Sequence, residues 1–76
     1  MESARSYLVV IERAQDGSYG AYVPDLPGCA VFGQETPAQA KQLISEAIEV
    51  HIEGLIEDGL PVPEPVTRGE YVETAK

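Results

Sequence analysis

Thiols, imidazoles and indoles are almost absent from this sequence. Cys29 is its only cysteine, His51 its only histidine, and it has no tryptophan. A lone cysteine has no intrachain disulfide partner, and a structural zinc site needs about four ligands of these types. We therefore expect no disulfide, no structural metal and no bound cofactor.

The chain is also short of the length that a well-buried core requires. A domain near 76 residues buries only ~60 % of its unfolded surface, so its stability is marginal. With disulfides and metals excluded, self-association is the remaining supplement. This elimination predicts a single domain over residues 1–76 that forms a homo-oligomer, either a dimer or a tetramer.

Positive charge is scarce. Lysine and arginine total 5 against 13 aspartate and glutamate residues, and the formal net charge is −8. The cations are scattered along the chain, whereas a nucleic-acid binder ordinarily presents a basic patch. We expect no direct binding of nucleic acid. The acidity indicates either a soluble surface alone or complementarity to a basic partner.

Long apolar runs are missing as well. No stretch approaches the ~20 apolar residues that span a bilayer, so no membrane association is expected. The first residues do not place a basic cluster before an apolar run, as a secretory signal would. A cytoplasmic location is expected, in agreement with the single unpaired cysteine.

Three strands are predicted in the first half of the chain. Residues 5–12 are rich in β-branched and aromatic residues, and because both faces of this segment are apolar we expect it to be a central strand. Asp16-Gly17 favours a hairpin turn into residues 19–23, which end at Pro24. A short third strand is expected over residues 29–32.

One long helix is predicted next. Thr36 supplies an N-cap hydroxyl, Pro37 stands at the first helical position, and Gln39 completes a capping box. Apolar residues then recur at helical spacing, and Gly59 provides a left-handed stop. The helix should run from Pro37 to about Glu57.

The remaining residues predict an extended end. Prolines alternate over residues 60–65, which excludes a central strand there. Residues 66–74 form either a last edge strand, around residues 70–73, or a tail. The element order predicts an α+β fold, with an antiparallel sheet of three to four strands and one long helix on one face.

Three blocks of the chain together resemble the HicB-type antitoxin family. They are residues 19–29 (YGAYVPDLPGC), residues 47–55 (AIEVHIEGL) and residues 58–65 (DGLPVPEP), with Gly33 and Thr36 between the first two. The resemblance covers about residues 7–66. It implies a partial ribonuclease-H-like domain that neutralises HicA, a small basic mRNA-cleaving toxin, and that self-associates.

The resemblance leaves operator binding by this chain in question and one alternative function open. Many family members carry a C-terminal operator-binding domain, and here the sequence stops at Lys76, so autorepression by this chain is not expected. The alternative function is a solitary self-assembling domain, structural or regulatory, that has no toxin partner.

A catalytic function is not expected. Glu12, Asp16, Asp25 and Glu35 do not fall on adjacent strand centres, as a two-metal carboxylate site would require. His51 lies within the apolar face of the helix, which favours a structural histidine. Cys29 has no nearby group that would lower its pKa, which favours a buried packing role.

The expected function is therefore partner binding. The stiff loop at residues 25–28, with Asp25 and Leu26, is either a rigid turn or a contact segment. Tyr19 and Tyr22 point to opposite faces of one strand, so one of them is available for contact. Acidic residues, among them Glu49 and Glu53, line the outer face of the helix, either as a solvated surface or to steer a basic partner.

Overall fold

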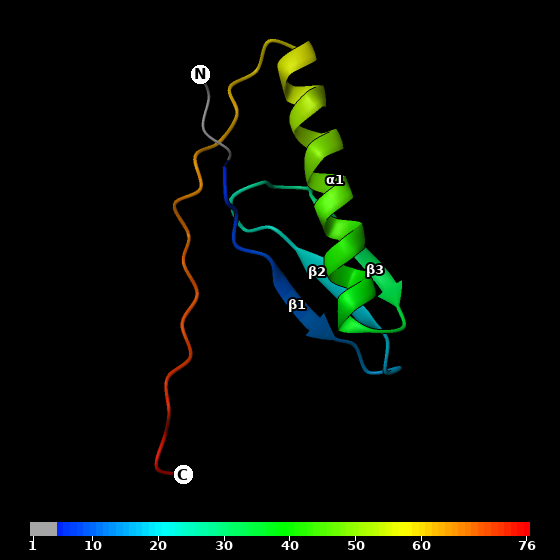
Figure 1. The fold of residues 1–76 in the computed structure, drawn as a ribbon, viewed down its shortest axis with the longest axis vertical. Coiled ribbons are helices and arrows are strands. Elements are labelled where there is room, and N and C mark those ends of the chain that lie inside the picture. The colour runs from blue at the N-terminus through cyan, green and yellow to red at the C-terminus, as the bar shows by residue number, and fades with distance from the viewer. Residues whose placement is uncertain (1–4) are drawn as a thin grey trace.

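The order of secondary-structure elements follows the sequence-based prediction. The computed structural model describes residues 5–76; residues 1–4, on which the expectation of no secretory signal mainly rests, lie outside this range. Strands β1 (Val10–Arg13), β2 (Tyr19–Tyr22) and β3 (Ala30–Gln34) form one antiparallel sheet in the order β1-β2-β3, and helix α1 (Pro37–Glu57) follows (Figure 1). The predicted α+β fold, an antiparallel sheet with one long helix, is confirmed.

The β1–β2 hairpin is closed by a side chain as well as by the backbone. The Asp16 carboxylate accepts hydrogen bonds from the backbone N–H and the hydroxyl of Ser18, at 2.9 and 2.7 Å. Gly17 adopts a φ of 88°, which glycine tolerates without strain. The predicted turn is confirmed. In the resulting register, Val10 lies opposite Tyr22 and Ile11 lies opposite Ala21.

Two expectations for the strands are wrong. Pairing in the first strand begins only at Val10, and β1 is an edge strand, because β2 is its only partner in the sheet. The third strand runs from Ala30 to Gln34, so it begins after Cys29 and continues past Phe32, where it was expected to end. The Cys29 carbonyl still accepts from Val23 in line with the β2–β3 register, but the Cys29 N–H donates to the Leu26 carbonyl within the loop.

Helix α1 begins and ends at the predicted residues. The Thr36 hydroxyl accepts from the Gln39 N–H at 3.1 Å, as predicted for the N-cap. The Gln39 side chain accepts at 3.0 Å from the N–H of Glu35, the residue before the N-cap, in place of the Thr36 N–H that a regular capping box would use. At the other end Gly59 has a φ of 69°, and Leu60 N–H donates to the Leu55 carbonyl. Local capping signals were therefore sufficient to bound the helix.

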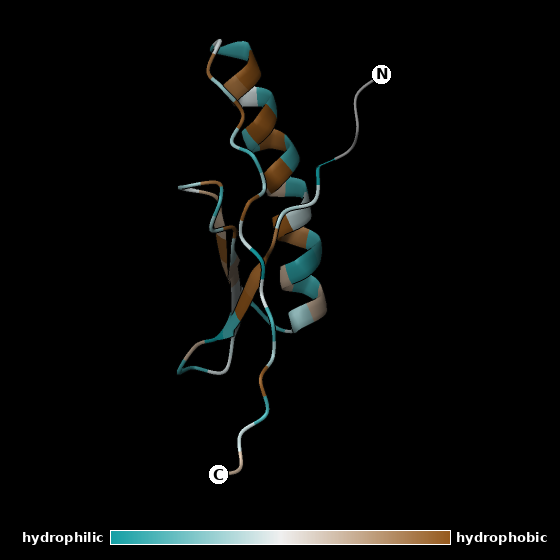
Figure 2. Cartoon of the chain, turned by 90° about the vertical axis from the view of Figure 1, so that its left-hand side faces the viewer, coloured by the Kyte–Doolittle hydropathy of each residue, from teal (hydrophilic) through white to brown (hydrophobic). Residues whose placement is uncertain are grey.

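The core lies between the sheet and the first half of α1. Its buried members are Ala21, Val23, Leu26, Cys29, Ala40 and Ile44. The second half of the helix extends past the end of the sheet (Figure 1), and there Val50 and Ile56 are mostly exposed. Figure 2 shows the helix on one side of the sheet and no other described element on the opposite side, which we call the open face.

Residues 60–76 form an extended segment, which we call the arm. It runs back from the end of α1 beside the β1 edge of the sheet and past its far end (Figure 1). Within residues 5–76, no backbone–backbone hydrogen bond joins the arm to β1, and the arm contains no strand. The prediction of an edge strand around residues 70–73 is therefore wrong for the single chain, and the alternative of a tail is correct.

Candidate partner-binding surface

The loop that follows β2 is a compact unit. Leu26 N–H donates to the Val23 carbonyl and Cys29 N–H to the Leu26 carbonyl, both at 3.0 Å, and Gly28 turns the chain with a φ of 85°. Val23 and Leu26 are 2 % and 0 % exposed. Because Leu26 is completely buried, it can assist a partner only by holding the loop in shape.

Asp25 uses its carboxylate within the chain. Its oxygens accept hydrogen bonds from the Val66 N–H at 3.0 Å, the Thr67 N–H at 2.9 Å and the Thr67 hydroxyl at 2.7 Å. These bonds, those from Thr67 foremost, hold the pKa of Asp25 below its usual value. Sequence reasoning treated Asp25 as a contact residue; in the structure the carboxylate first of all anchors the arm.

A second contact anchors the arm a few residues earlier. The Tyr7 hydroxyl donates to the Pro63 carbonyl at 2.6 Å, and Tyr7 packs against the core. The arm is thus attached on both sides of Pro65, once to the segment before β1 and once to the loop after β2. Residues 63–67 are part of the folded body, whereas the residues after Thr67 have no such anchor.

The two tyrosines of β2 point to opposite faces of the strand, as predicted. Tyr19 packs against the core on the helix side, and Tyr22 is 40 % exposed on the open face. The tyrosine available to a partner is therefore Tyr22. Its cross-strand neighbours are Val10 on β1 and Ala30 on β3, both small or apolar.

Phe32 joins Tyr22 on the open face and was not singled out from the sequence. It is 79 % exposed, and with Tyr22 it borders a hollow of about 220 Å³ that is floored by Gly20 and flanked by Glu12 and Arg13. A Cβ at Gly20 would lie 2.9 Å from the Val31 carbonyl oxygen and 3.5 Å from Phe32 Cδ1. The hollow therefore depends on glycine at this position.

Strand alternation places Phe32 on the open face once the register of the sheet is known. Successive strand residues face opposite sides. Val31 pairs with the buried Ala21 and packs against the core, so its neighbour Phe32 must point to the open face.

The predicted acidic residues lie on the opposite side of the molecule. Glu46, Glu49, Glu53 and Glu57 are all exposed on the face of α1 that is turned away from the sheet. Within the described residues 5–76 the only ion pair joins Arg68 and Glu70, so the charge of Glu49 and Glu53 is not neutralised by a cation. One flat partner cannot touch this acidic face and the open face at once.

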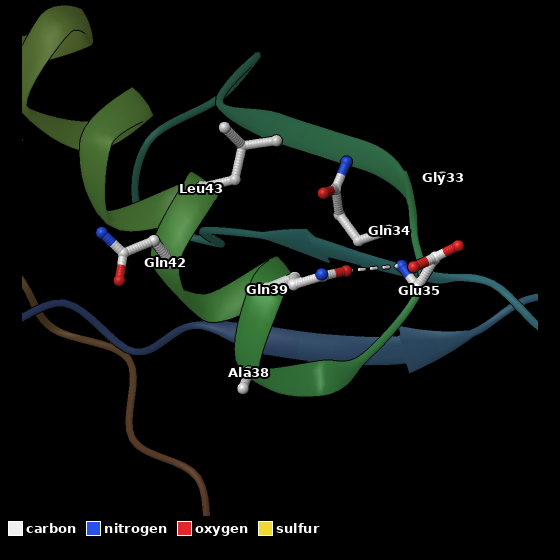
Figure 3. Close-up of a pocket in the computed structure, with 7 residues that line it drawn as sticks. All are labelled: Gly33, Gln34, Glu35, Ala38, Gln39, Gln42 and Leu43. Atoms are coloured by element: carbon white, nitrogen blue, oxygen red, sulfur yellow. Dashed lines mark hydrogen bonds between the residues drawn. The ribbon is translucent and has the colours of Figure 1, made fainter.

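A larger hollow lies between β3 and the start of α1. Its volume is about 620 Å³, and Gly33, Gln34, Glu35, Ala38, Gln39, Gln42 and Leu43 line it (Figure 3). The Gln39 side chain is already engaged at the start of the helix, as the dashed bond to Glu35 in Figure 3 shows. The lining offers amides and one carboxylate but no nucleophile beside a base, so the hollow suits binding rather than chemistry.

The residues considered as catalytic candidates do not form one cluster in the structure. In the part of the chain that the structure describes, no three His, Cys, Asp or Glu side chains are grouped to hold a metal ion. Asp16 serves the hairpin turn and Asp25 the arm, and His51 is half-buried on α1. Cys29 is buried, which raises its pKa and disfavours the reactive thiolate.

Comparison with known protein families identifies the chain. A family model described as a HicB-like antitoxin of bacterial toxin–antitoxin systems matches residues 7–76. The chain belongs to the HicB-like antitoxin family. Residues 5–76 contain no helix with the length and apolar character needed to cross a membrane.

Several curated proteins are similar to this HicB-like chain. A UPF0150 protein of Synechocystis sp. is 47 % identical over 58 residues, which cover 76 % of this chain and 72 % of the relative. A UPF0150 protein of Thermoplasma acidophilum is 40 % identical over 57 residues, covering 75 % and 81 %.

A third relative is longer than this chain. It is an uncharacterized 14.9 kDa protein of Haemophilus phage HP1, 39 % identical over 66 residues, which cover 87 % of this chain but only 48 % of the phage protein. No solved structure matches the chain at a significant level.

Proposed function

We propose that this HicB-like chain neutralises a small, basic HicA-type toxin by covering the RNA-binding or catalytic surface of that toxin with its open face. Family membership supports a role in a toxin–antitoxin system. The observation that carries the choice of surface is the pair Tyr22 and Phe32, exposed beside an apolar hollow on a side of the sheet that no described element covers. Exposed aromatic side chains around a pocket are typical anchors of protein interfaces.

The remaining predicted residues take different parts in this proposal. Tyr19 and Leu26 support the contact surface from within, because they pack in or against the core. Glu49 and Glu53 act at a distance, because they face away from the proposed contact. With a net charge of −8, the chain attracts a basic toxin before the two surfaces meet.

The mechanism needs no chemistry from this chain. An antitoxin of this kind occludes the catalytic surface of its toxin and cleaves nothing itself. We expect the purified chain not to cleave RNA or RNA–DNA hybrids in the presence of magnesium or manganese. Cleavage that disappears in an Asp25→Asn variant would replace this proposal by an enzymatic one.

The proposal predicts that a short basic protein is encoded beside this chain's gene, and the test uses that protein as the toxin. Cleavage of an mRNA substrate by that toxin should stop at one chain of antitoxin per toxin. Phe32→Ser should weaken the complex by at least tenfold, whereas Val50→Ser, at another mostly exposed apolar position, on α1, should leave it unchanged. If Val50→Ser weakens the complex and Phe32→Ser does not, the toxin binds the helix and the open face is the wrong surface.

A self-assembling domain without a toxin is the second candidate. The feature that favours it is the arm, whose last residues are extended, apolar in part and unpaired. If no neighbouring basic protein binds the chain, this function takes the place of the antitoxin proposal.

A further inference from the structure

The small hollow on the open face has a carboxylate on one wall. In the β1–β2 register Glu12 lies opposite Gly20, and residues directly opposite each other in an antiparallel pair point to the same face. Gly20 precedes the buried Ala21 on β2, so Gly20 and Glu12 both belong to the open face. Because Gly20 has no side chain, the exposed Glu12 side chain borders open space.

The opposite wall of the hollow is the ring of Phe32, which a bulge places there. The β2–β3 pairing shifts register between Tyr19 and Ala21, where β3 advances three residues and β2 only two. The extra residue of β3 falls opposite Gly20, and such bulges re-aim the side chains around them. A Cβ at Gly20 would lie 3.5 Å from Phe32 Cδ1, so the ring stands directly beside the space above the glycine.

Tyr22 stands at one end of the hollow, two residues beyond Gly20 on the same face of β2. Arg13 is a further neighbour, but its side chain belongs to the other face of the sheet. It pairs with Tyr19, which packs against the core on the helix side. In the described part of the chain, the functional groups that border the hollow on the open face are therefore two aromatic rings and one carboxylate.

This combination selects a cation. An anionic side chain is repelled by Glu12, and an apolar one would take the carboxylate out of water without giving it a partner. The only ion pair among residues 5–76 joins Arg68 and Glu70, so no cation of the described chain already neutralises Glu12. Aromatic rings attract cations to their faces, and apolar walls suit the methylene stem of a long basic side chain.

Arginine fits the hollow better than lysine. A planar guanidinium can stack on the Phe32 ring while two of its N–H groups donate to the two oxygens of Glu12. An ammonium group is a compact, strongly hydrated charge that can do neither. A hollow of about 220 Å³ has room for one long side chain, not for a helix or a loop.

We propose that the hollow bordered by Glu12, Tyr22 and Phe32 receives one arginine side chain of the basic toxin. The inference rests on the proposed function, and it names the chemical group by which the open face recognises its partner. Arginine is a common ligand of phosphate groups, so an arginine held here is withdrawn from the RNA that the toxin would bind. Gly20 is part of the recognition, because any side chain at this position would fill the hollow.

The first experiment needs no toxin. N-acetyl-arginine amide is titrated into the isotope-labelled chain, and the backbone amides of Gly20, Tyr22 and Phe32 are followed by NMR. These signals should shift saturably at millimolar concentrations of the arginine derivative, and the lysine derivative should bind about fivefold more weakly. The norleucine derivative, which keeps the stem but has no charge, should cause no such shift.

Two variants make this titration specific. Glu12→Gln should abolish the shifts, whereas Glu73→Gln, which removes the same charge from the exposed arm, should leave them unchanged. The proposal is overturned by any of three results: no shift with the arginine derivative, equal shifts with the norleucine derivative, or undiminished shifts in Glu12→Gln.

The second experiment uses the toxin. Glu12→Gln should weaken the complex by about tenfold, and Phe32→Leu should have a similar effect because leucine keeps the apolar wall but has no ring. The arginines of the toxin are then changed to glutamine one at a time. One of these changes should be strongly non-additive with Glu12→Gln, as expected for two partners in one contact. If every toxin arginine is additive with Glu12→Gln, the hollow holds no arginine.

The outcomes separate this inference from the proposed function. If Phe32→Ser weakens the complex and Glu12→Gln does not, the open face binds the toxin without an arginine in the hollow, and only the inference is wrong. If the parent chain binds no toxin, the proposed function fails, and the arginine titration alone decides whether the hollow binds a guanidinium. Helical circular dichroism of Glu12→Gln and Phe32→Leu should match that of the parent, so that a loss of binding is not a loss of fold.

Discussion

Asp25 and Thr67 are joined by two hydrogen bonds across a separation of 42 residues. One carboxylate oxygen accepts from the Thr67 N–H at 2.9 Å and the other from its hydroxyl at 2.7 Å. The pair connects the loop after β2 to the arm after α1, and both segments lie outside the sheet and helix. It therefore sets where the anchored part of the arm ends and the free part begins.

Removing this carboxylate should loosen the arm. In Asp25→Ala, the amides of Val66 and Thr67 should exchange faster and the unfolding temperature should fall, because three hydrogen bonds to the carboxylate are lost. Glu64→Ala, which changes an exposed acidic residue of the arm that has no such bonds, is the matched control. Hydrogen exchange followed by NMR measures both variants.

Binding kinetics can then show whether Asp25 contacts the toxin directly or acts only by holding the arm. Thr67→Val removes one bond of the anchor but leaves the Asp25 carboxylate in place. If the carboxylate touches the toxin, Asp25→Ala should speed dissociation and Thr67→Val should not. Equal effects of the two variants would show that Asp25 acts only through the arm.

Acid should release the anchored part of the arm. The folded-state pKa of Asp25 lies below the usual value of an aspartate because Thr67 and Val66 donate to the ionised form. A carboxyl with a depressed folded pKa contributes stability that is complete above its unfolded pKa and is lost as the pH falls through the folded value. The anchor should thus be intact at neutral pH.

An NMR titration of the Thr67 amide tests this pH dependence. The amide shift should move with a midpoint below the usual aspartate pKa and be flat at neutral pH. In Asp25→Ala the transition should disappear from Thr67, while the Ser18 amide, which donates to Asp16, should still titrate. A midpoint at or above the usual pKa of an exposed aspartate in the parent chain would contradict the anchor.

Two glycine substitutions should have opposite effects on the free energy of unfolding. Gly20→Ala places a Cβ 2.9 Å from the Val31 carbonyl oxygen within the β2–β3 ladder and should cost about 1–3 kcal/mol. Gly54→Ala in α1 meets nothing within 4 Å and should stabilise by about 0.5–1 kcal/mol. Urea unfolding measures both; a neutral Gly20→Ala would mean that the two strands separate easily.

The features that were predicted correctly depend on neighbours in the sequence. Thr36 and Gln39 cap the helix across three residues, and Asp16 and Ser18 close the hairpin across two. The bounds of α1 and the position of the turn could therefore be derived from the sequence. Such signals act within one turn of the chain, whatever the rest of the fold does.

The features that were missed depend on distant residues. Two apolar faces on residues 7–11 predicted a central strand, yet the pattern does not say what covers the second face, and β1 lies at an edge. Asp25 meets its partner 42 residues later, which no local pattern encodes. For the same reason the burial of Leu26 in the core was not foreseen from its loop sequence.

The acidic face of α1 should govern how fast the chain meets a basic toxin, and Tyr22 how slowly it leaves. Charges at Glu49 and Glu53 act over distance and are screened by salt, with a Debye length of about 8 Å at physiological ionic strength. Changing both to glutamine should therefore slow association and flatten its salt dependence, without altering dissociation. Changing Glu64 and Glu73 to glutamine alters the net charge equally but leaves this face intact, so it should slow association less.

Tyr22→Ala should instead speed dissociation, at a cost of about 1–3 kcal/mol for a central contact. Surface-based kinetics against the toxin at two or more salt concentrations separates these effects. If the Glu49/Glu53 variant associates at the parent rate in low salt, the acidic face is a solvated surface and nothing more.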